Sequence, residues 1–554
     1  MKITLRLRGV SGAIGLILLL FSLTFILPIV VAVWYSENIV TTIISYLVPM
    51  IITANIGLIL WLIGNEAVIK EKKIFLAIGL GWVVMMAFPV AMIIPIGTQM
   101  FYVIAASILT IIFITIFTIL RFFERNISLE LRDREAFVTV GVGWLLIAFL
   151  GSLPYVFSNT LGYVDGFFET ASGFATCGST VLTVPNGMDY LNVYSHSIMF
   201  WRALTQWLGG MGIIVLSVVV LTRVMGAGGA RLFRAEAAGH RVTRLKPRLR
   251  ETASILWKIY LLFTVVQIIL LVTAGMSVYD AVCHSFTSIA TGGFSTHYSN
   301  VEYYNNPIIE TIIIAFMFIG GTSFILHYSV LTGKPMVLLK DPEFRFYMFT
   351  IITGTMLVTL SLVMNNVYSA AESFRHGIFN VVSINTATGF SSTNFDLWPA
   401  SAKIVLVVLM FVGGCVGSTA GGIKIIRILI LLKMGKREIQ KVVRPRAVMP
   451  IILGGKPLSE DIVKNVSSFF LLYLLTFIVA TILLSFTGLD AVTSSTAVAT
   501  TMGGVGPGFG GVGPANTFAF ISPFGKILLS ICMWIGRLEI FTCLILFLPG
   551  TYKS

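Results

Sequence analysis

Charged residues are scarce in this 554-residue sequence, at 11% against 56% hydrophobic residues. So little charge, together with long apolar runs, excludes an ordinary soluble globular protein. Acidic residues are fewer than basic ones: the sequence has 24 Asp and Glu and 38 Lys and Arg, which gives a net charge of +14. The first explanation of this positive excess is the orientation of the protein in a bilayer. The second is an anionic surface, of lipid or protein, that faces the basic loop Arg231–Arg250. We therefore expect no nucleic acid as a partner.

Cysteine and histidine are also few, and their spacing excludes several kinds of site. The five cysteines contain no Cys-x-x-Cys pair, so neither a disulfide framework nor a metal centre is indicated. The six histidines show no metal-ligand spacing, and neither a Walker loop nor a Ser-His-acid arrangement occurs. We expect no enzyme activity and no organic cofactor.

Apolar runs of about twenty residues, enough to cross ~30 Å of hydrocarbon, recur along the sequence. They predict an all-α polytopic membrane protein. The expected spans lie near 11–34, 42–64, 74–96, 99–122, 136–158, 193–222, 255–275, 308–331, 346–365, 401–431, 465–486 and 525–549.

The distribution of charge predicts the orientation of these spans. Lys and Arg concentrate in the N-terminus and in loops that alternating spans place on one side, which is the cytoplasmic side. Both termini are then cytoplasmic, and the first apolar run is too long for a cleaved signal peptide. Acids mark the outer side, at Asp165, Glu169, Asp189, Asp280, Glu302, Glu310, Glu372, Asp396 and Asp490.

Four widely spaced segments carry a short run rich in Ser, Thr and Ala that arrives at a glycine. Four such loops around one axis can replace the water shell of a cation with backbone carbonyls. Glycine suits this role because inward-pointing carbonyls need dihedrals that a Cβ makes costly. A single string of this kind also occurs in ordinary turns, but four in register favour an ion filter. The candidate filter residues are Ala175, Thr176, Cys177, Gly178, Ala290, Thr291, Gly292, Gly293, Thr386, Ala387, Thr388, Gly389, Gly504, Val505, Gly506 and Pro507.

An acid precedes each filter loop. In the first two segments Asp165 and Asp280 stand thirteen residues before the filter glycine. Asp490 stands sixteen residues before, which we attribute to a loop lengthened by Met502–Gly504, and the third segment has Glu372 nearby. Such acids are expected to cap the N-termini of half-crossing pore helices.

One span is rich in glycine, and another contains an arginine. The glycines are expected to break the span near 401–431 into a mobile gating loop beneath the filter; close helix packing is the alternative. Arg537 lies within a span, where it either faces the pore as a positive barrier that coordinates with the loop or bonds neighbouring carbonyls. Arg202 lies nearer the outer end and is expected to snorkel. The candidate gate residues are Gly413, Gly414, Gly417, Gly421, Gly422, Lys424 and Arg537.

At these motifs the sequence resembles the membrane subunit (TrkH/TrkG type) of bacterial Trk potassium-uptake systems, in the Trk/Ktr/HKT superfamily. The likeness runs from about residue 132 to the C-terminus. It is carried by Trp201–Ile214, Leu232–Glu236, Asp280–His297, Gly417–Lys424 and Gly536–Phe541.

The resemblance implies four non-identical pore domains around one K⁺ pathway, with K⁺ as the transported ion. It places the filter glycines at Gly178, Gly293, Gly389 and Gly506, the gating loop at 413–422 and the pore arginine at Arg537. It further implies a homodimer in the bacterial inner membrane, surrounded by lipid, that binds a cytosolic TrkA-type nucleotide-binding regulatory subunit. The implied division is 1–130 N-terminal helices, 131–225 pore domain 1, 226–252 basic loop, 253–335 pore domain 2, 336–445 pore domain 3 and 446–554 pore domain 4.

Two departures and two alternatives remain. The pair of spans near 74–122 is additional to the family pattern, and Cys177 stands where a Thr-rich filter is more usual. A Na⁺-permeable, K⁺/Na⁺ or K⁺/H⁺ symporting member is the nearest alternative; such members are usually marked by a serine at a filter glycine, which none of the four positions shows. A membrane enzyme or respiratory-complex subunit would need clustered His or carboxylates at membrane depth.

Overall fold

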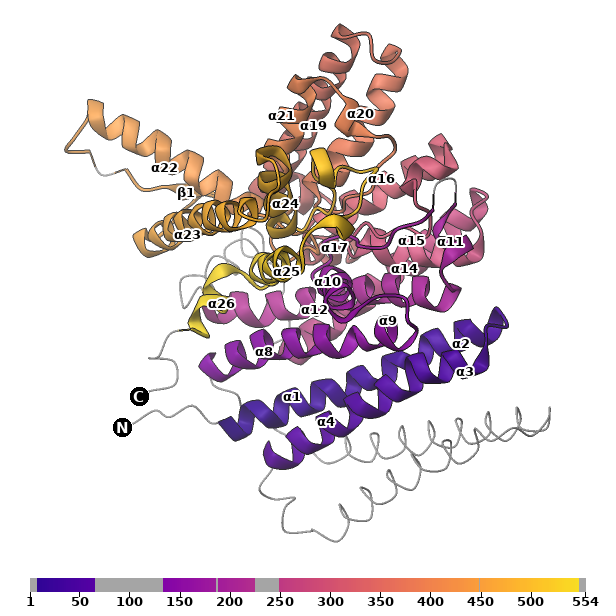
Figure 1. The fold of residues 1–554 in the computed structure, drawn as a ribbon. Coiled ribbons are helices and arrows are strands. Elements are labelled where there is room, and N and C mark those ends of the chain that lie inside the picture. The colour runs from indigo at the N-terminus through magenta and orange to yellow at the C-terminus, as the bar shows by residue number, and fades with distance from the viewer. Residues whose placement is uncertain (1–6, 65–132, 186–187, 225–248, 448, 548–554) are drawn as a thin grey trace, which may run out of the picture. The chain divides into compact units, whose positions relative to one another are not determined.

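The computed structural model describes residues 7–64, 133–185, 188–224, 249–447 and 449–547. In these ranges the chain is helical except for loops and one two-stranded antiparallel sheet, β1 (Ile452–Leu453) with β2 (Lys456–Pro457) (Figure 1). The all-α prediction is therefore confirmed. The predicted spans near 74–122 and most of the basic loop 226–252 lie outside the described residues.

The chain divides into two compact units, and each is described by itself. The first holds residues 1–21, 52–140 and 549–554. Its described part contains most of α1 (Leu7–Ser22) and α4 (Val48–Gly64) and the start of α8 (Asp133–Gly151). Gly15 and Gly64 let α1 and α4 approach closely, because a Cβ at either would collide with the backbone of the other helix.

The second unit, residues 22–51 and 141–548, holds the remaining elements. Those before the third segment are η1 (Leu23–Phe25), α2 (Ile26–Trp34), α3 (Ile39–Thr42), η2 (Ile43–Leu47), α9 (Leu153–Phe157), α10 (Tyr163–Phe174), α11 (Tyr190–Val193), α12 (His196–Val224), α14 (Leu249–Thr273), α15 (Val278–Ile289), η3 (Asn300–Tyr304), α16 (Pro307–Gly321), α17 (Phe324–Leu331) and α18 (Met336–Lys340). The later ones are α19 (Pro342–Met364), α20 (Ala370–Asn385), η4 (Phe395–Leu397), α21 (Ala400–Phe411), α22 (Ile425–Val443), α23 (Glu460–Ser485), α24 (Ala491–Gly503), η5 (Gly510–Val512), η6 (Phe518–Phe520), α25 (Pro523–Leu538) and α26 (Ile540–Ile545).

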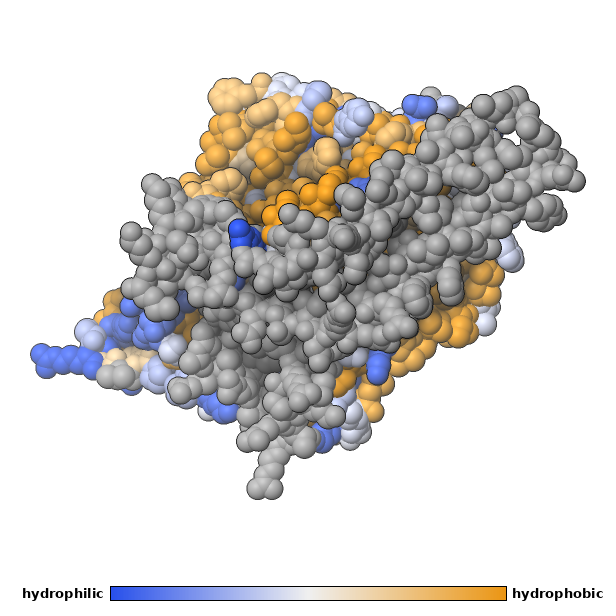
Figure 2. All heavy atoms as spheres, turned by 90° about the horizontal axis from the view of Figure 1, so that it is seen from below, coloured by the Kyte–Doolittle hydropathy of each residue, from blue (hydrophilic) through white to orange (hydrophobic). Residues whose placement is uncertain are grey.

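Among the described residues, six helices are long and apolar enough to cross a membrane, or seven if one bent pair is a single span. The exposed side chains of these helices are themselves apolar, for example Val265 and Ile269 on α14 and Met356 and Leu360 on α19. In Figure 2 the described surface in view is largely orange, the colour of hydrophobic residues. An apolar surface of this extent is expected where the helices face lipid rather than water.

Two predicted spans are wrong as continuous helices. The span near 308–331 is the bent pair, with an angle of 105° between α16 and α17. The span near 525–549 ends as α25 at Leu538, where Glu539 takes a φ of +68° before α26 begins. In the first case the break follows Gly320-Gly321, and paired glycines within a helix suit either close packing or a bend.

Four short helices, α10, α15, α20 and α24, each precede one of the glycine loops. Each is followed along the chain by a further helix of its segment, respectively α12, α16, α21 and α25. The following helix of each segment packs against the short helix of the next: α12 against α15, α16 against α20, α21 against α24 and α25 against α10. Because the last contact returns to the first segment, the four segments close into a cycle.

The short helices begin in three ways, with glycine (Gly162, for α10), serine or aspartate as the N-cap, and only the aspartate agrees with the predicted acidic caps. Asp490 is the N-cap of α24, where its carboxylate accepts hydrogen bonds from the N–H groups of residues 492 and 493. In α15 and α20 the caps are serines, Ser277 and Ser369, and the acids Asp280 and Glu372 lie three residues later. All of these acids sit in the first turn or at the cap, where the helix dipole favours negative charge.

These caps also correct the explanation of the spacing before the fourth filter glycine. Asp490 lies at the cap, three residues earlier in its helix than Asp165 and Asp280 lie in theirs, which accounts for sixteen residues instead of thirteen. No lengthened loop is needed. In the third segment the helix has 16 residues against 12 in α10 and α15, about one extra turn.

Candidate functional site

The four predicted filter glycines meet in space as a closed ring. A Cβ added at Gly178 would collide with the carbonyl oxygen of Gly292, in the second segment. A Cβ at Gly293 would collide with a carbonyl oxygen of the third segment. In the same way, a Cβ at Gly389 would collide with a carbonyl oxygen of the fourth segment, and a Cβ at Gly506 with one of the first. Each loop thus lies against the carbonyls of the next. The colliding oxygens belong to Gly292, Thr388, Val505 and Cys177.

The four loops share one backbone conformation. The filter glycines have φ of +88°, +75°, +83° and +96°, in chain order. The residue two positions earlier also has a positive φ in every loop: Thr176 at +49°, Thr291 at +52°, Ala387 at +55° and Gly504 at +70°. Positive φ is rare for a β-branched residue and needs support from its surroundings, which is typical of a functional site.

Side chains outside the loops hold this backbone in place. The amide of Gln206, on α12, donates to the carbonyl of Gly292 (2.7 Å) and accepts from the N–H of Phe294 (3.1 Å). The hydroxyl of Ser179 donates to the carbonyl of Gly506 (3.1 Å), which joins the first loop to the fourth. Such bonds fix the carbonyls without requiring a bound ligand.

A cavity of about 50 Å³, here called the filter cavity, opens at this ring. All four filter glycines line it, together with polar residues that follow them along the chain, such as Ser179, Ser295 and Ser391. The cavity therefore lies where the four loops leave the ring, and its lining is rich in hydroxyl and carbonyl oxygen.

Arg202 does not snorkel, and this prediction was wrong. Its side chain is buried, and Nε donates to the carboxylate of Glu169 at 2.6 Å. Nη1 donates to the carbonyl of Ser295 (2.8 Å), and the guanidinium lies 3.7 Å from the ring centroid of Phe294. The arginine instead connects α10 and α12 to the loop that follows Gly293. Its charge can be buried because the carboxylate of Glu169 neutralises it.

The glycine-rich stretch between α21 and α22 breaks the predicted span, as expected. Residues 412–424 form a loop, here called the gate loop, closed by a single parallel bridge between Val412 and Ile423. It packs into the break after α16: the N–H groups of Cys415 and Thr419 donate to the carbonyls of Gly321 (2.9 Å) and Gly320 (3.1 Å).

The gate loop also touches the predicted filter. The hydroxyl of Thr419 donates to the carbonyl of Ile289 (2.9 Å) and lies 3.3 Å from the hydroxyl of Thr291. Gly421 lies so close to the carbonyl of Gly503 that a Cβ would collide with it. The gate loop is thus in contact with the second filter loop and with the end of α24.

Arg537 contacts the same loop. Its Nη1 donates to the carbonyl of Thr419 (2.7 Å), and Nη2 lies 3.4 Å from the carbonyl of Gly209. Glu539, two residues on, pairs instead with Arg427 at 2.8 Å. Arg537 therefore bonds neighbouring carbonyls, and one of them belongs to the gate loop. Its action as a positive barrier in the pathway stays a prediction.

A second cavity of about 50 Å³, here called the gate cavity, is lined by residues 416–418, 420–422, Lys424, Arg427, Arg537 and Glu539, among others. The ammonium of Lys424 donates back to the carbonyl of Ala420 in the loop. Three cationic side chains against one carboxylate make the lining positive, which opposes the presence of a cation.

The sequence model of the TrkH family, described as a cation transport protein, matches residues 101–551. This chain belongs to the TrkH family of cation transport proteins. It is 42% identical over 430 residues to the Trk system potassium uptake protein TrkH of Salmonella typhimurium, covering 77% of this chain and 87% of the relative. It is 33% identical over 432 residues to the Trk system potassium uptake protein TrkI of Halomonas elongata, covering 77% and 86%.

A solved structure agrees with this family assignment. The fold superposes on the crystal structure of the potassium transporter TrkH from Vibrio parahaemolyticus with a TM-score of 0.79. The match has 32% sequence identity and covers 98% of this chain and 99% of the other. The chain therefore shares the multi-pass helical architecture of that transporter.

The residues that sequence reasoning singled out are brought together in two groups, one at the ring and one at the gate loop. Reasoning from local motifs missed the partners of these groups: Glu169 beside Arg202, Gln206 beside Gly292, and Arg427 beside Glu539. A buried charge or amide within an apolar segment was the available signal, but the sequence does not state which distant group satisfies it.

Proposed function

We propose that this protein carries K⁺ into the cell through the ring of filter loops. The observation that carries the proposal is the cyclic closure of Gly178, Gly293, Gly389 and Gly506 against the carbonyls of the next loop. Four loops of one conformation supply stacked carbonyl oxygens, which can substitute for the hydration shell of a cation. The K⁺ specificity follows the potassium uptake function named for the relatives.

The gate loop and Arg537 form the gate of this pathway. The loop spans the interval between the filter and the gate cavity, and its glycines allow it to change conformation. Arg537 adds a positive charge that raises the barrier for a cation and that holds the loop through Thr419. Uptake is driven by the membrane potential, worth about 2.3 kcal/mol per charge per 100 mV.

The filter cavity faces outside and the gate cavity faces the cytoplasm. The alternation of the predicted spans assigns most basic residues to loops on one side, and the positive-inside rule makes that side the cytoplasm of a bacterial inner membrane, with both termini. The protein acts as a homodimer, and a cytosolic TrkA-type nucleotide-binding subunit controls the gate loop. Flux measured with and without a pH gradient distinguishes channel-like uptake from symport with H⁺ or Na⁺.

The test is rubidium uptake and growth at low K⁺ in a bacterium that lacks its own K⁺ uptake. The native chain should restore both, and Gly293→Ser should abolish uptake or its preference for K⁺ over Na⁺. Gly275→Ser is the matched control, because Gly275 has a similar φ of +97° but no atom within 4 Å of its would-be Cβ. No rescue by the native chain, or equal effects of the two substitutions, would contradict the proposal.

A further inference from the structure

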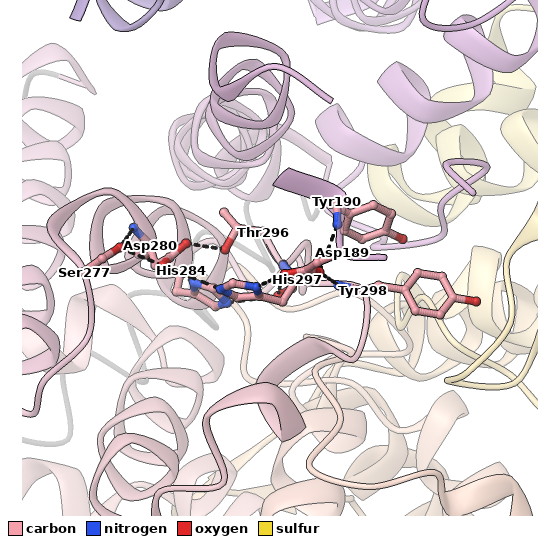
Figure 3. A network of polar contacts seen from close by, with 9 residues as sticks. Asp189, Tyr190, Ser277, Asp280, His284, Thr296, His297 and Tyr298 are labelled. Carbon is pink, nitrogen blue, oxygen red and sulfur yellow. Dashed lines mark hydrogen bonds and ion pairs between the residues drawn. The ribbon is translucent and has the colours of Figure 1, made fainter. Parts of the chain in front are cut away.

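His297 links two carboxylates beside the filter. It follows Gly293 by four residues and lines the filter cavity. Its Nδ1 contacts the carboxylate of Asp189, in the loop after the first filter segment, and its Nε2 lies 3.5 Å from Oδ2 of Asp280, on α15 (Figure 3). The histidine thus connects the outer loops of the first and second segments.

Both carboxylates are fixed by further hydrogen bonds. Asp189 accepts from the N–H groups of Tyr190 (2.9 Å) and Tyr298 (2.7 Å). Asp280 accepts from the hydroxyl groups of Ser277 (2.7 Å) and Thr296 (2.6 Å) (Figure 3). Neither acid can turn away from His297 without breaking these bonds, so the geometry around the imidazole is set by its surroundings.

The other polar groups around His297 do not replace this contact. Tyr303 stacks on the imidazole at 3.6 Å and Tyr304 meets it edge-on at 5.3 Å. His284, at 6.5 Å, has its Nδ1 against the carbonyl of residue 280 and its Nε2 against the hydroxyl of Ser295. The remaining charge lining the cavity is the guanidinium of Arg202, already paired with a glutamate.

The two contacts of His297 require its proton. A protonated imidazole donates from both nitrogens, whereas either neutral tautomer turns a lone pair toward one of the carboxylates. Burial acts to lower the pKa of His297, but the two carboxylates more than offset it, so the pKa lies above its ordinary value of 6.5. Loss of the proton therefore turns one attractive contact into a repulsive one.

We propose that His297 is a positioning residue whose proton fixes the outer mouth of the filter, so that cation uptake depends on external pH. The proposal rests on the function proposed above. The imidazole sits on the same loop as Gly293, and release of its contact with Asp189 or Asp280 removes one of the contacts that position the segment between Gly293 and Tyr298. Uptake and preference for K⁺ over Na⁺ are then highest with His297 protonated and fall as external pH rises through its pKa.

Rubidium influx at fixed internal pH, with external pH varied from about 5.5 to about 9, tests this proposal. Native influx should fall by roughly tenfold across the range, with stronger inhibition by Na⁺ at the alkaline end. In His297→Gln, whose side chain cannot titrate, influx should no longer show this fall with rising external pH. Asp189→Asn keeps an oxygen acceptor but removes a charge, so the midpoint should move to lower pH by about one unit or more.

His376→Gln is the matched control, because His376 lies in the short helix of the third segment and its Nδ1 contacts the hydroxyl of Ser392 (3.0 Å) rather than a carboxylate. It should keep the native pH profile. An unchanged profile in His297→Gln, an unmoved midpoint in Asp189→Asn, or influx that rises with pH would overturn the proposal. Absence of any influx by the native chain would instead contradict the proposed function.

Discussion

The carboxylate of Glu343 accepts a hydrogen bond from the backbone N–H of Val416 at 2.8 Å. Glu343 is a buried residue in the first turn of α19, and Val416 lies in the gate loop. This bond connects the start of a membrane span to the segment proposed to gate the pathway. A buried N–H that loses its acceptor costs about 1–3 kcal/mol, so the bond contributes to the stability of the loop conformation.

Replacement of Glu343 is therefore expected to release the gate loop. Glu343→Leu leaves the N–H of Val416 without its acceptor and should raise rubidium leak through the protein in liposomes that lack the regulatory subunit. Glu343→Gln keeps an oxygen acceptor at nearly the same place and should leak much less. Equal leak from the two variants would show that the charge of Glu343, and not its hydrogen bond, holds the loop.

The pair of Glu169 and Arg202 is expected to stabilise the fold around the first two filter loops. Arg202→Met leaves a buried carboxylate unpaired, which should cost about 3–5 kcal/mol and lower the Tm of the purified protein. The double variant Glu169→Gln with Arg202→Met should recover part of the loss. If the single and double variants melted at the same temperature, the unpaired carboxylate of Glu169 would carry no penalty, which would contradict this prediction.

Asp280 is expected to make stability depend on acid pH. Burial acts to raise its pKa, but the imidazole of His297 at 3.5 Å and hydrogen bonds from Thr296 and Ser277 hold the pKa well below its ordinary value of 3.8. A carboxylate with a depressed folded-state pKa stabilises the protein above its unfolded pKa, and this stability is lost as pH falls through the folded one.

Melting curves of detergent-solubilised protein should therefore show a contribution of about 1–3 kcal/mol that disappears toward strongly acid pH. Asp280→Asn should remove this part of the pH dependence. Asp461→Asn, at an exposed position in the first turn of α23, should leave it in place. A native-like acid profile in Asp280→Asn would contradict the assignment.

Arg537 is expected to limit the rate of uptake. Arg537→Gln keeps a donor for the carbonyl of Thr419 but removes the charge, so cation influx should increase, roughly fivefold for each ~1 kcal/mol taken from the barrier. Arg537→Lys retains the charge and should stay close to the native rate. Lower influx in Arg537→Gln would mean that the charge organises the pathway instead of obstructing it.

The ring and the gate loop could be predicted from sequence because both depend on short local motifs. The positive φ of Gly178 or Gly293 follows from a glycine at a repeated place, and a glycine-rich span is a poor helix wherever it occurs. Even so, local spacing misjudged the start of α24, since it could not distinguish an acid at the cap from one in the first turn.

The contacts that hold these motifs could not be predicted in the same way. Arg202 and Glu169 are 33 positions apart, and His297 and Asp189 are 108 apart. Such pairs are decided by how helices pack, and any of several acids could have served. The break between α16 and α17 was equally hidden, because two glycines suit a tight crossing as well as a bend.

The cyclic order of the four glycine loops has a consequence for how the proposed pathway can vary. A pore assembled from identical subunits repeats every substitution at each position around its axis. Here one chain encodes all four quadrants separately, so a single codon change alters one wall and leaves three as they were. Cys177 and His297 are differences of this kind, because each is present in one of the four loops alone. Selection can therefore change the surroundings of the ring at one loop without changing the other three.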